Sequence, residues 1–514
     1  MKRLSFLTRT SFLLGFFFAF DKLLAFARSI IIARQFRLSF ELDAFNVANN
    51  LPDLLFALIS GGALAMAFIP VLSEHLTLRG REDTWALFSR VANIAFVVTA
   101  LLAVVIAIFA NQIVRAQIGI APGFNTDQQS LIAQLMRLNL IATLIFSISG
   151  LVIAGLQANQ HFLLPALAPT LYNIGQIFGA LVLSPKVPYT IGPLTLPHFG
   201  LGVYGLVYGV IIGAALHLGI QIPGLIKYKF RWTASLNFLD PGVIEVFKVV
   251  GPRLLTMFGI QLMFIARDNF ASRLGTIGSV SSLTYGWMIM QVPETLIGTA
   301  IATALLPTIS EYAARSDWAA FRQTIEKAVR VMLALTLPIA AVIAVGLRPL
   351  VQFTFGFDPA GTDLLTWTTR VFLLTLAGYS VQEVMARAFY ARKEAWWPFF
   401  SVTMRIVIYL TVGFLAISYF KGIGAPAIAL AELSLTVEAI FLLFVLNRKL
   451  PERITAGSSV LKGFGAALVS GAVAYALAVY LPGNAILTAL VGMSVGGAVA
   501  LPFITRELRL LFNL

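Results

Sequence analysis

The stretch "FFFAFDKLLAFARSIIIAR", residues 16–34, joins an apolar run to charges in its middle. About twenty apolar residues suffice for a helix to cross a hydrocarbon core of roughly 30 Å. Asp21, Lys22 and Arg28 interrupt the run, although a charge near the bilayer centre costs at least about 2.5 to 3.5 kcal/mol. Charges that persist there usually face protein or a water-filled cavity. We therefore expect a membrane helix with one polar, functional face.

Apolar runs of this length recur along all 514 residues, of which 59% are hydrophobic and 12% charged. Soluble domains average about 25% charged residues. The sequence therefore predicts an all-α polytopic membrane protein of about fourteen transmembrane helices, with no soluble domain. The predicted spans are 10–36, 43–73, 85–114, 128–157, 162–184, 199–226, 244–273, 279–311, 323–356, 362–390, 396–419, 425–447, 459–481 and 484–505.

The net charge of +14 does not indicate nucleic-acid binding, because the basic residues fall in alternate loops. This distribution is typical of an inner (plasma) membrane protein that follows the positive-inside rule. It predicts that both termini are cytoplasmic, which an even number of spans requires. The basic residues assigned to the cytoplasmic side are Lys2, Arg3, Arg79, Arg81, Lys227, Lys229, Arg231, Arg315, Arg322, Arg392, Lys393, Arg448, Lys449, Arg453, Arg506 and Arg509.

The N-terminal residues also permit a second interpretation, as a signal peptide with Ala25-Phe26-Ala27 as its cleavage site. Asp21 and Lys22 interrupt the apolar run where a signal peptide should be uninterrupted, so we favour a first membrane helix. Motifs for catalysis and cofactors are absent from the sequence. It has no Cys, no phosphate-binding GxxxxGK[ST], four scattered His, and no catalytic constellation, so we predict no enzyme, no cofactor and no metal site. Gly205 and Gly209 in "GLVYGV" predict close helix packing.

Two pairs of similar segments indicate an internal duplication. "FIPVLSEH" at 68–75 resembles "LLPTISEY" at 305–312, and "ANQHFLLP", ending at Pro165, resembles "ARKEAWWP", ending at Pro398. A six-helix unit repeated once gives parallel repeats, the architecture of many transporters with alternating access. The predicted parts are an N-terminal lobe (1–230), a C-terminal lobe (231–450) and two extra helices (451–514).

Charges at membrane depth give the candidate site residues. Asp21 and Arg28 are seven residues apart, nearly on one helical face, with Lys22 about 100° round. They can line one cavity, or Asp21 and Lys22 can simply neutralise each other; we favour the cavity because Arg28 gains nothing from lipid.

The second span adds polar residues around a proline, in "NVANNLPDLLFALISGGALA". Pro52 removes a backbone donor and should kink this helix beside Asn49 and Asp53. The eighth span repeats the pattern with Glu294 next to Pro293, and the seventh span contributes Arg267. Other polar residues of these three spans are Asn46, Asn50, Arg253, Asp268, Arg273 and Gln291; weaker candidates elsewhere are Arg137, Arg370, Glu383, Arg387, Arg405, Glu432 and Glu438.

Five segments together resemble the MurJ (MviN) family of lipid II flippases, in the multidrug/oligosaccharidyl-lipid/polysaccharide exporter superfamily. The resemblance covers nearly the whole chain and keeps the family order. The segments are "DKLLAFARSIIIARQF", "LDAFNVANNLPDLL", "GGALAMAFIPVLSE", "FLLPALAPTLYNIGQI" and "GSVSSLTYGWMIMQVPETLIGTAIATALLPTISEY". The resemblance implies two lobes in a V shape around a cationic cavity, which binds the diphosphate and sugars of an undecaprenyl-linked peptidoglycan precursor. The two extra helices would form a groove for its lipid tail.

The resemblance also implies roles for individual residues. Arg28 and Lys22 stand where the family has cavity cations, Asp43 matches an acidic residue of the first outer loop, and Asp53 falls where an asparagine is usual. Two further cavity arginines of the family are replaced here, by Phe56 and Met288. A diphosphate requires several convergent cations, so either Arg267, Arg253 or another cation substitutes, or the head group differs. Arg267 and Tyr409 stand near positions that the family can use for sodium, so sodium coupling is not expected.

The leading functional hypothesis is a flippase that moves lipid II to the outer leaflet by alternating access, without ATP. An exporter of another polyprenyl-linked saccharide and a non-transporting scaffold for cell-wall enzymes are the alternatives. The expected partners are lipid II or a related undecaprenyl diphosphate-linked glycan, membrane lipids and cell-wall synthesis proteins, with no nucleic acid.

Overall fold

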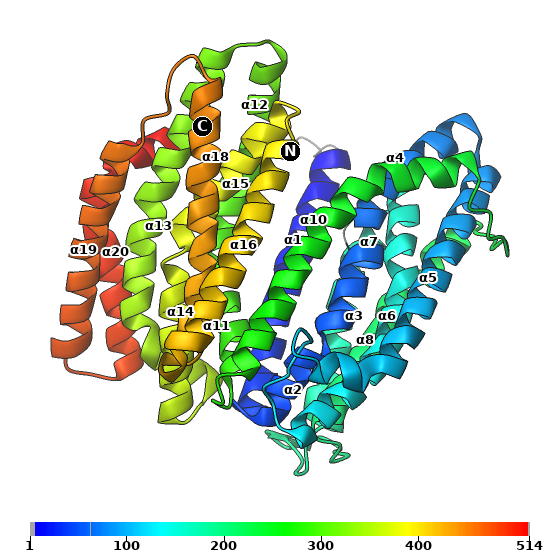
Figure 1. Ribbon diagram of the computed structural model, residues 1–514, viewed down its shortest axis with the longest axis horizontal. Coiled ribbons are helices and arrows are strands. Elements are labelled where there is room, and N and C mark those ends of the chain that lie inside the picture. Colours follow the sequence, from blue (N-terminus) through cyan, green and yellow to red (C-terminus); the bar gives the residue numbers. More distant parts are fainter. Residues whose placement is uncertain (1–5, 62, 512–514) are drawn as a thin grey trace. The chain divides into compact units, whose positions relative to one another are not determined.

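The computed structural model describes residues 6–61 and 63–511, which are almost entirely helical (Figure 1). Lys2 and Arg3, assigned above to the cytoplasmic side, lie outside the described residues. The first helix, α1 (Phe6–Phe36), continues without a break through residues 25–27. The chain divides into two compact units, Met1–Asn269 and Phe270–Leu514. The predicted boundaries at 230 and 450 stay a prediction.

Helices form the first unit because most of its sequence consists of long apolar runs, which in lipid must satisfy every backbone group internally. After α1 its elements are α2 (Phe40–Ala48), α3 (Asn50–Leu55), η1 (Phe56–Gly61), α4 (Ala63–Leu78), α5 (Arg81–Arg115), α6 (Thr126–Ala158), α7 (Leu163–Phe178), η2 (Gly179–Leu183), β1 (Thr190–Ile191), β2 (Leu194–Thr195), α8 (Val203–Gly219), α9 (Ile222–Lys227) and most of α10 (Pro241–Ser272).

The second unit is helical for the same reason. Its elements are α11 (Ser279–Glu294), η3 (Thr295–Thr299), α12 (Ala300–Ala314), α13 (Trp318–Phe355), α14 (Pro359–Leu373), α15 (Leu376–Ala391), α16 (Trp396–Tyr419), η4 (Lys421–Ile423), α17 (Ala425–Ala429), η5 (Leu430–Leu433), α18 (Ser434–Lys449), α19 (Gly457–Tyr480) and α20 (Ala485–Leu511).

Ten helices of the described chain are long and apolar enough to cross a membrane. The helical fold of a polytopic membrane protein is thus confirmed. The other four predicted spans coincide with α1, with α2 to α4, with α10 and with α14 to α15. The segments α2 to α4 and α14 to α15 are divided into helices of fewer than 18 residues, and α1 and α10 carry several of the charged residues noted above. The count of fourteen stays a prediction.

The second and eighth predicted spans are both interrupted by π-helical segments. In the first unit, η1 begins four residues after Pro52, and in the second unit η3 begins two residues after Pro293. Proline removes a backbone donor, and π-helical turns often occur at functional sites. The predicted irregularity of these two helices is confirmed, and its presence in both units supports the internal repeat.

A second correspondence between the units involves two arginines that were weaker site candidates. Arg137 on α6 donates from Nε to the carbonyl of Ala107 on α5, at 2.8 Å. Arg370 on α14 donates from Nε to the carbonyl of Ala344 on α13, also at 2.8 Å. Each of these hydrogen bonds joins the guanidinium to a neighbouring helix of the same unit. They give both arginines a structural role and add to the evidence for duplication.

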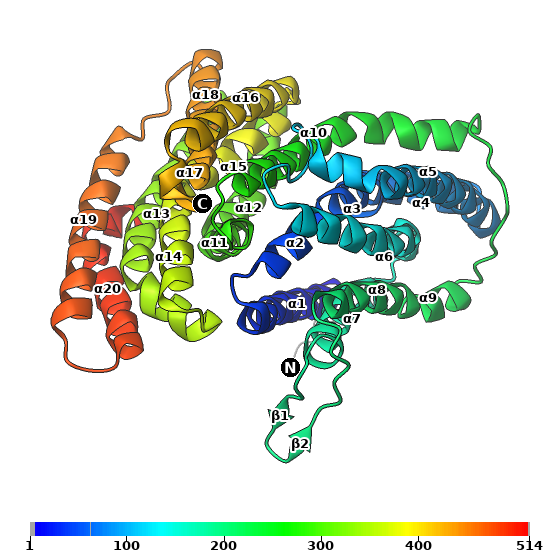
Figure 2. The same ribbon diagram turned by 60° about the horizontal axis from the view of Figure 1, so that its bottom comes forward.

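Glycines let α7 and η2 approach α8 closely. A Cβ on Gly175 would lie 2.3 Å from Cα of Gly213, and a Cβ on Gly209 would lie 2.8 Å from Cα of Gly179. The prediction that Gly209 serves helix packing is therefore confirmed. Between these two helices the chain forms the short antiparallel hairpin β1–β2, which projects from the helices in Figure 2.

The last two helices, α19 and α20, pack against each other and against α13 (Figure 1). Small residues make the contact close, since a Cβ on Gly492 would lie 2.8 Å from the carbonyl oxygen of Ala474. Glu507 of α20 is buried and pairs with Lys462 of α19 at 3.3 Å. The helices α19 and α20 come after the other elements of the second unit in the chain, where the two extra helices were predicted.

Candidate functional site

Asn173 of α7 bridges the two opposite charges of α1. Its Nδ2 donates to Oδ1 of Asp21 at 2.8 Å, and its Oδ1 accepts from Nη1 of Arg28 at 2.8 Å. Asp21 and Arg28 lie two turns apart on α1, so one amide can contact both only because they share a face, as predicted. Asn173 is buried, and α7 packs along α1. The amide therefore holds a carboxylate and a guanidinium in fixed positions.

Arg28 keeps most of its hydrogen-bonding capacity. A guanidinium has five N–H donors, and Asn173 uses one of them. Nε of Arg28 is buried and has no hydrogen-bond partner in the described part of the chain. The side chain of Lys22 is exposed. One partly buried guanidinium with free donors and one exposed ammonium on the same helix are suited to binding an anion such as a phosphate.

The structure brings Asp53 and Tyr172 towards the same cation, since both lie within electrostatic range of the Arg28 guanidinium. Asp53 is exposed at the surface of α3. Asn49 lies one turn earlier and accepts a hydrogen bond from Nδ2 of Asn139 on α6, at 2.6 Å. Asp53 is therefore grouped with Arg28, while Asn49 connects the second predicted span to α6.

Arg267 is buried in a separate polar cluster of the first unit. Its Nε donates to Oδ1 of Asp268 at 2.8 Å, and Oδ2 of Asp268 accepts from Asn50 at 2.9 Å. The adjacent carboxylate of Asp268 therefore balances the charge of the buried Arg267 guanidinium. Asp43 is fully buried in the first turn of α2. The side chain of Arg253, the other proposed substitute, lies outside the described residues.

Phe56 and Met288 stand at positions where arginines were expected, and Phe56 packs against another aromatic ring. The Phe56 ring packs edge-on against Phe146 at 5.0 Å, and Phe146 packs in turn against Tyr172 at 5.1 Å. Met288 is half-buried on α11. Phe56 therefore contributes to aromatic packing at a position where the family resemblance implied a cation.

A second group of polar residues lies in the second unit, on α15, α16, η5 and α18. Arg387 pairs with Glu383, and Arg405 pairs with Glu432 at 3.2 Å. Glu438 accepts hydrogen bonds from Ser401 at 2.9 Å and from Gln382 at 3.1 Å. Apart from Arg370, the weaker candidates of the second unit thus lie in one group, in which Arg387 and Arg405 are each paired with a carboxylate.

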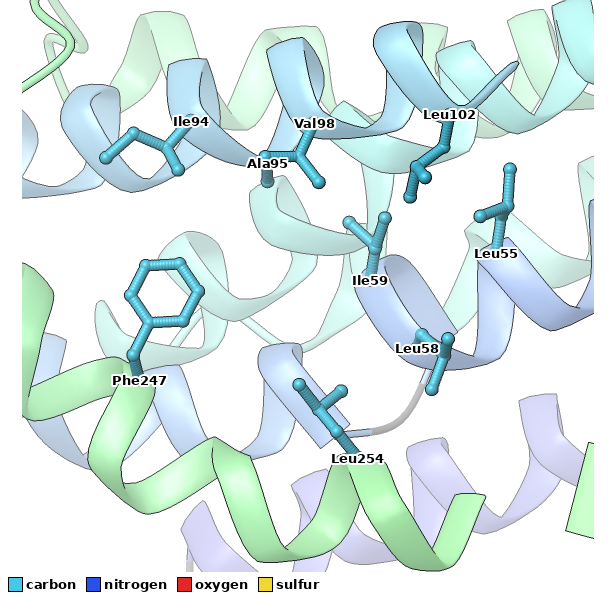
Figure 3. Close-up of a pocket in the computed structure, with 9 residues that line it drawn as sticks. All are labelled: Leu55, Leu58, Ile59, Ile94, Ala95, Val98, Leu102, Phe247 and Leu254. Atoms are coloured by element: carbon cyan, nitrogen blue, oxygen red, sulfur yellow. The ribbon is translucent and has the colours of Figure 1, made fainter. Parts of the chain in front are cut away.

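The first unit also contains an apolar cavity of about 210 Å³, between η1, α5 and α10 (Figure 3). Its apolar lining offers no partner for a diphosphate or a sugar, so it is unsuited to a polar head group. The residues that line it are Leu55, Leu58, Ile59, Ile94, Ala95, Val98, Leu102, Phe247 and Leu254.

Sequence reasoning missed Asn173 and Asn139, which hold the candidate residues in place. Each is a single amide within an apolar helix and is almost fully buried. An isolated Asn in a membrane helix requires a hydrogen-bond partner. That rule identifies both as interhelical contacts, but only the fold supplies the partner.

The sequence of this chain is similar to those of known proteins. The family model described as lipid II flippase MurJ matches residues 32–495. The chain belongs to this family. Lipid II flippase MurJ of Burkholderia cenocepacia is 29% identical over 80% of this chain and 77% of its own length. The probable lipid II flippase MurJ of Buchnera aphidicola from Acyrthosiphon pisum is 26% identical, over 84% and 81%.

Solved structures agree with the fold. Lipid II flippase MurJ in an inward closed conformation covers 98% of this chain and 100% of its own, with a TM-score of 0.80 and 22% identity. An inward-facing MATE family transporter of the MOP superfamily covers 84% of this chain and 94% of its own, with a TM-score of 0.67 and 15% identity. Family membership and the apolar helices indicate a multi-pass inner-membrane protein.

Proposed function

We propose that the protein is a flippase that moves lipid II from the inner to the outer leaflet by alternating access. The observation that carries this proposal is the Asp21–Asn173–Arg28 arrangement in a chain of the MurJ family. Asn173 orients Arg28 while leaving its Nε without a partner in the described residues. A lipid-linked diphosphate supplies the acceptors that such a donor needs.

Arg28 is the residue most directly assigned to the diphosphate, with Lys22 as a second cation. Asp21 and Asn173 position the guanidinium, and Asp53 adjusts the local charge. Arg267 is a weaker candidate for this role because Asp268 balances its charge. The roles of Asp43 and Asn49 remain predictions. The cytoplasmic location of both termini also remains a prediction. The same holds for membrane lipids and cell-wall synthesis proteins as binding partners.

An exporter of another polyprenyl-linked saccharide is the second candidate. The packing of Phe56 against Phe146 favours it, because an apolar side chain occupies a position where a cation for the diphosphate was expected. Such a site would bind fewer phosphate oxygens and rely more on contacts with the saccharide.

Competition binding separates the two candidates. Labelled lipid II is bound to the purified protein and displaced by unlabelled lipid II or by another polyprenyl diphosphate-linked saccharide. We expect lipid II to displace the label at the lower concentration, and Arg28→Gln to weaken its binding, while the exposed Arg115→Gln leaves it unchanged. Preferential displacement by the other saccharide would favour the second candidate, and no lipid II binding would contradict the proposal.

A further inference from the structure

The polar cluster of the second unit contains a buried carboxyl group without a cation of its own. Glu438 of α18 is fully buried. Its Oε1 accepts hydrogen bonds from two neutral donors, the Ser401 hydroxyl at 2.9 Å and the Gln382 amide at 3.1 Å. Its Oε2 has no hydrogen-bond partner in the part of the chain that the structure describes. Oε1 therefore acts as a hydrogen-bond acceptor, like the carbonyl oxygen of a protonated carboxyl group. Oε2 is the oxygen that can carry the proton.

The nearest cation to Glu438 is already engaged. Nη1 of Arg405 lies 3.9 Å from Oε2 of Glu438, beyond hydrogen-bond distance, while Nη2 of Arg405 lies 3.2 Å from Glu432. Nε of Arg405 is buried and has no hydrogen-bond partner in the described chain. One guanidinium thus faces two carboxylates, and Glu432 has the closer contact.

The charge on the surrounding helices does not compensate for Glu438. α15 contributes Glu383, which is paired with Arg387, and α16 contributes Arg405. η5 contributes Glu432, and Glu438 itself lies on α18. Each of these two guanidinium groups is therefore paired with a carboxylate other than Glu438. A buried carboxylate without a paired cation is costly at membrane depth, and one proton on the carboxyl removes its charge.

We propose that Glu438 and Glu432, with Arg405 as their internal counter-ion, form a proton-binding site whose proton is exchanged during transport. The proposal rests on the flippase function and names the ion that drives it. A bare metal cation is disfavoured because the Arg405 guanidinium already provides the positive charge between the two carboxylates. A proton binds as a covalent O–H on one carboxyl oxygen and needs only a neutral site.

Proton release changes the contacts between two helices. The structure shows Arg405 paired with Glu432, which is the contact expected while Glu438 carries the proton. On release to water, the proton leaves Oε2 with a negative charge, which attracts the Arg405 guanidinium across the 3.9 Å gap. The guanidinium is then shared between η5 and α18. Since η5 is a 3-10 segment between α17 and α18, this shift acts at an irregular point of the twelfth predicted span.

Infrared difference spectroscopy tests the proton site without any transport. The purified protein is titrated in light and heavy water, and the C=O band of protonated carboxyl groups is followed. We expect a band that shifts in heavy water and is absent in Glu438→Gln, and that persists in Glu311→Gln, a change at an exposed carboxylate of α12. Glu432→Gln should alter the band's pH dependence. A spectrum that Glu438→Gln leaves unchanged would overturn the proton site.

Lipid II movement in proteoliposomes tests the coupling. With one proton exchanged per lipid, a gradient of about one pH unit, acidic on the outer side, supports up to about tenfold outward accumulation. Glu438→Gln should abolish the effect of the gradient, and Glu311→Gln should not. Wild-type movement that ignores the gradient would overturn the coupling. If no lipid II moves under any condition, the proposed flippase function fails, while the infrared band still decides the proton site.

Discussion

At the scale of single residues, Asn173 is the contact on which the geometry of the candidate site depends. Replacing it with Ala removes the partner of both Asp21 and Arg28 and leaves two charges without their shared amide. We expect Asn173→Ala to lower the free energy of unfolding by about 1 to 3 kcal/mol and to weaken lipid II binding.

Thermal unfolding and lipid II binding of the purified variant measure both effects. Asn237→Ala, at an exposed loop residue, is the control and should change neither. If Asn173→Ala bound lipid II as tightly as the wild type, the positioning role of this amide would be refuted.

Glu394, in the loop between α15 and α16, makes the stability of the protein depend on pH in the acidic range. Partial burial acts to raise the pKa of Glu394, but hydrogen bonds from Lys449 and Arg392 outweigh it and hold that pKa below its ordinary value of 4.5. Because the pKa is lowered on folding, the stabilisation is complete above the unfolded value and is lost as the pH falls through the folded value.

Unfolding temperatures measured between about pH 6 and pH 3 test this dependence. The wild type should lose more stability on acidification than Glu394→Gln, whose side chain cannot titrate. Glu311→Gln, at an exposed carboxylate, should follow the wild type. Parallel curves for Glu394→Gln and the wild type would show that this ion pair contributes nothing.

Several candidate residues could be predicted because their chemistry conflicts with lipid. Asp21 and Arg28 stood out as charges in an apolar run, and their spacing predicted the face that Asn173 contacts. Asn173 itself was not singled out, since one amide in a helix does not identify its partner. Arg137 and Arg370 were weaker candidates because of their charge alone, and the sequence did not indicate that each hydrogen-bonds a backbone carbonyl of a neighbouring helix.

At the scale of elements, the close contact of α7 and α8 depends on the absence of side chains. A Cβ at position 209 would approach Gly179 Cα to 2.8 Å, so Gly209→Ala forces the helices apart. We expect it to cost about 1 to 3 kcal/mol and to displace Asn173, which lies on α7. Gly219→Ala, in the same helix but with open space around the added methyl, is the matched control for unfolding measurements. Equal stability of the two variants would contradict the packing argument.

The arginine–carbonyl contacts predict matching effects in the two units. Arg137→Ala and Arg370→Ala each remove a charged donor from a backbone acceptor, so each should lower stability by about 1.5 to 3 kcal/mol. Arg315→Ala, at an exposed salt bridge, should have a much smaller effect in the same thermal unfolding assay. A large loss for one arginine and none for the other would contradict their equivalent roles.

The elements themselves could be predicted where hydropathy was uninterrupted. The kinks at Pro52 and Pro293 also followed from sequence, but the π-helical form of η1 and η3 did not, because proline removes a donor without specifying how the backbone adjusts. The hairpin β1–β2 was missed, since its four residues lie in a loop too short for a periodic signal.

At the scale of the whole molecule, the proposed anion site lies in the first unit and the proposed proton site in the second. Arg28 and Lys22 are two cations on one helix of the first unit, whereas Arg405 is a guanidinium that faces two carboxylates, Glu432 and Glu438. The sequence repeat predicts similar scaffolds for the units, and the polar clusters on these scaffolds are built from different charged groups. Head-group movement in one unit and proton exchange in the other would then be two parts of one transport cycle.

Translocation of lipid II by the purified protein in liposomes tests the central claim most directly. The account predicts that the wild type carries lipid II across the bilayer, and that Arg28→Gln slows this by at least about tenfold, equivalent to about 1.4 kcal/mol. Arg115→Gln, at an exposed arginine, should retain the wild-type rate. Translocation by Arg28→Gln at the wild-type rate, or none by the folded wild type, would contradict the account.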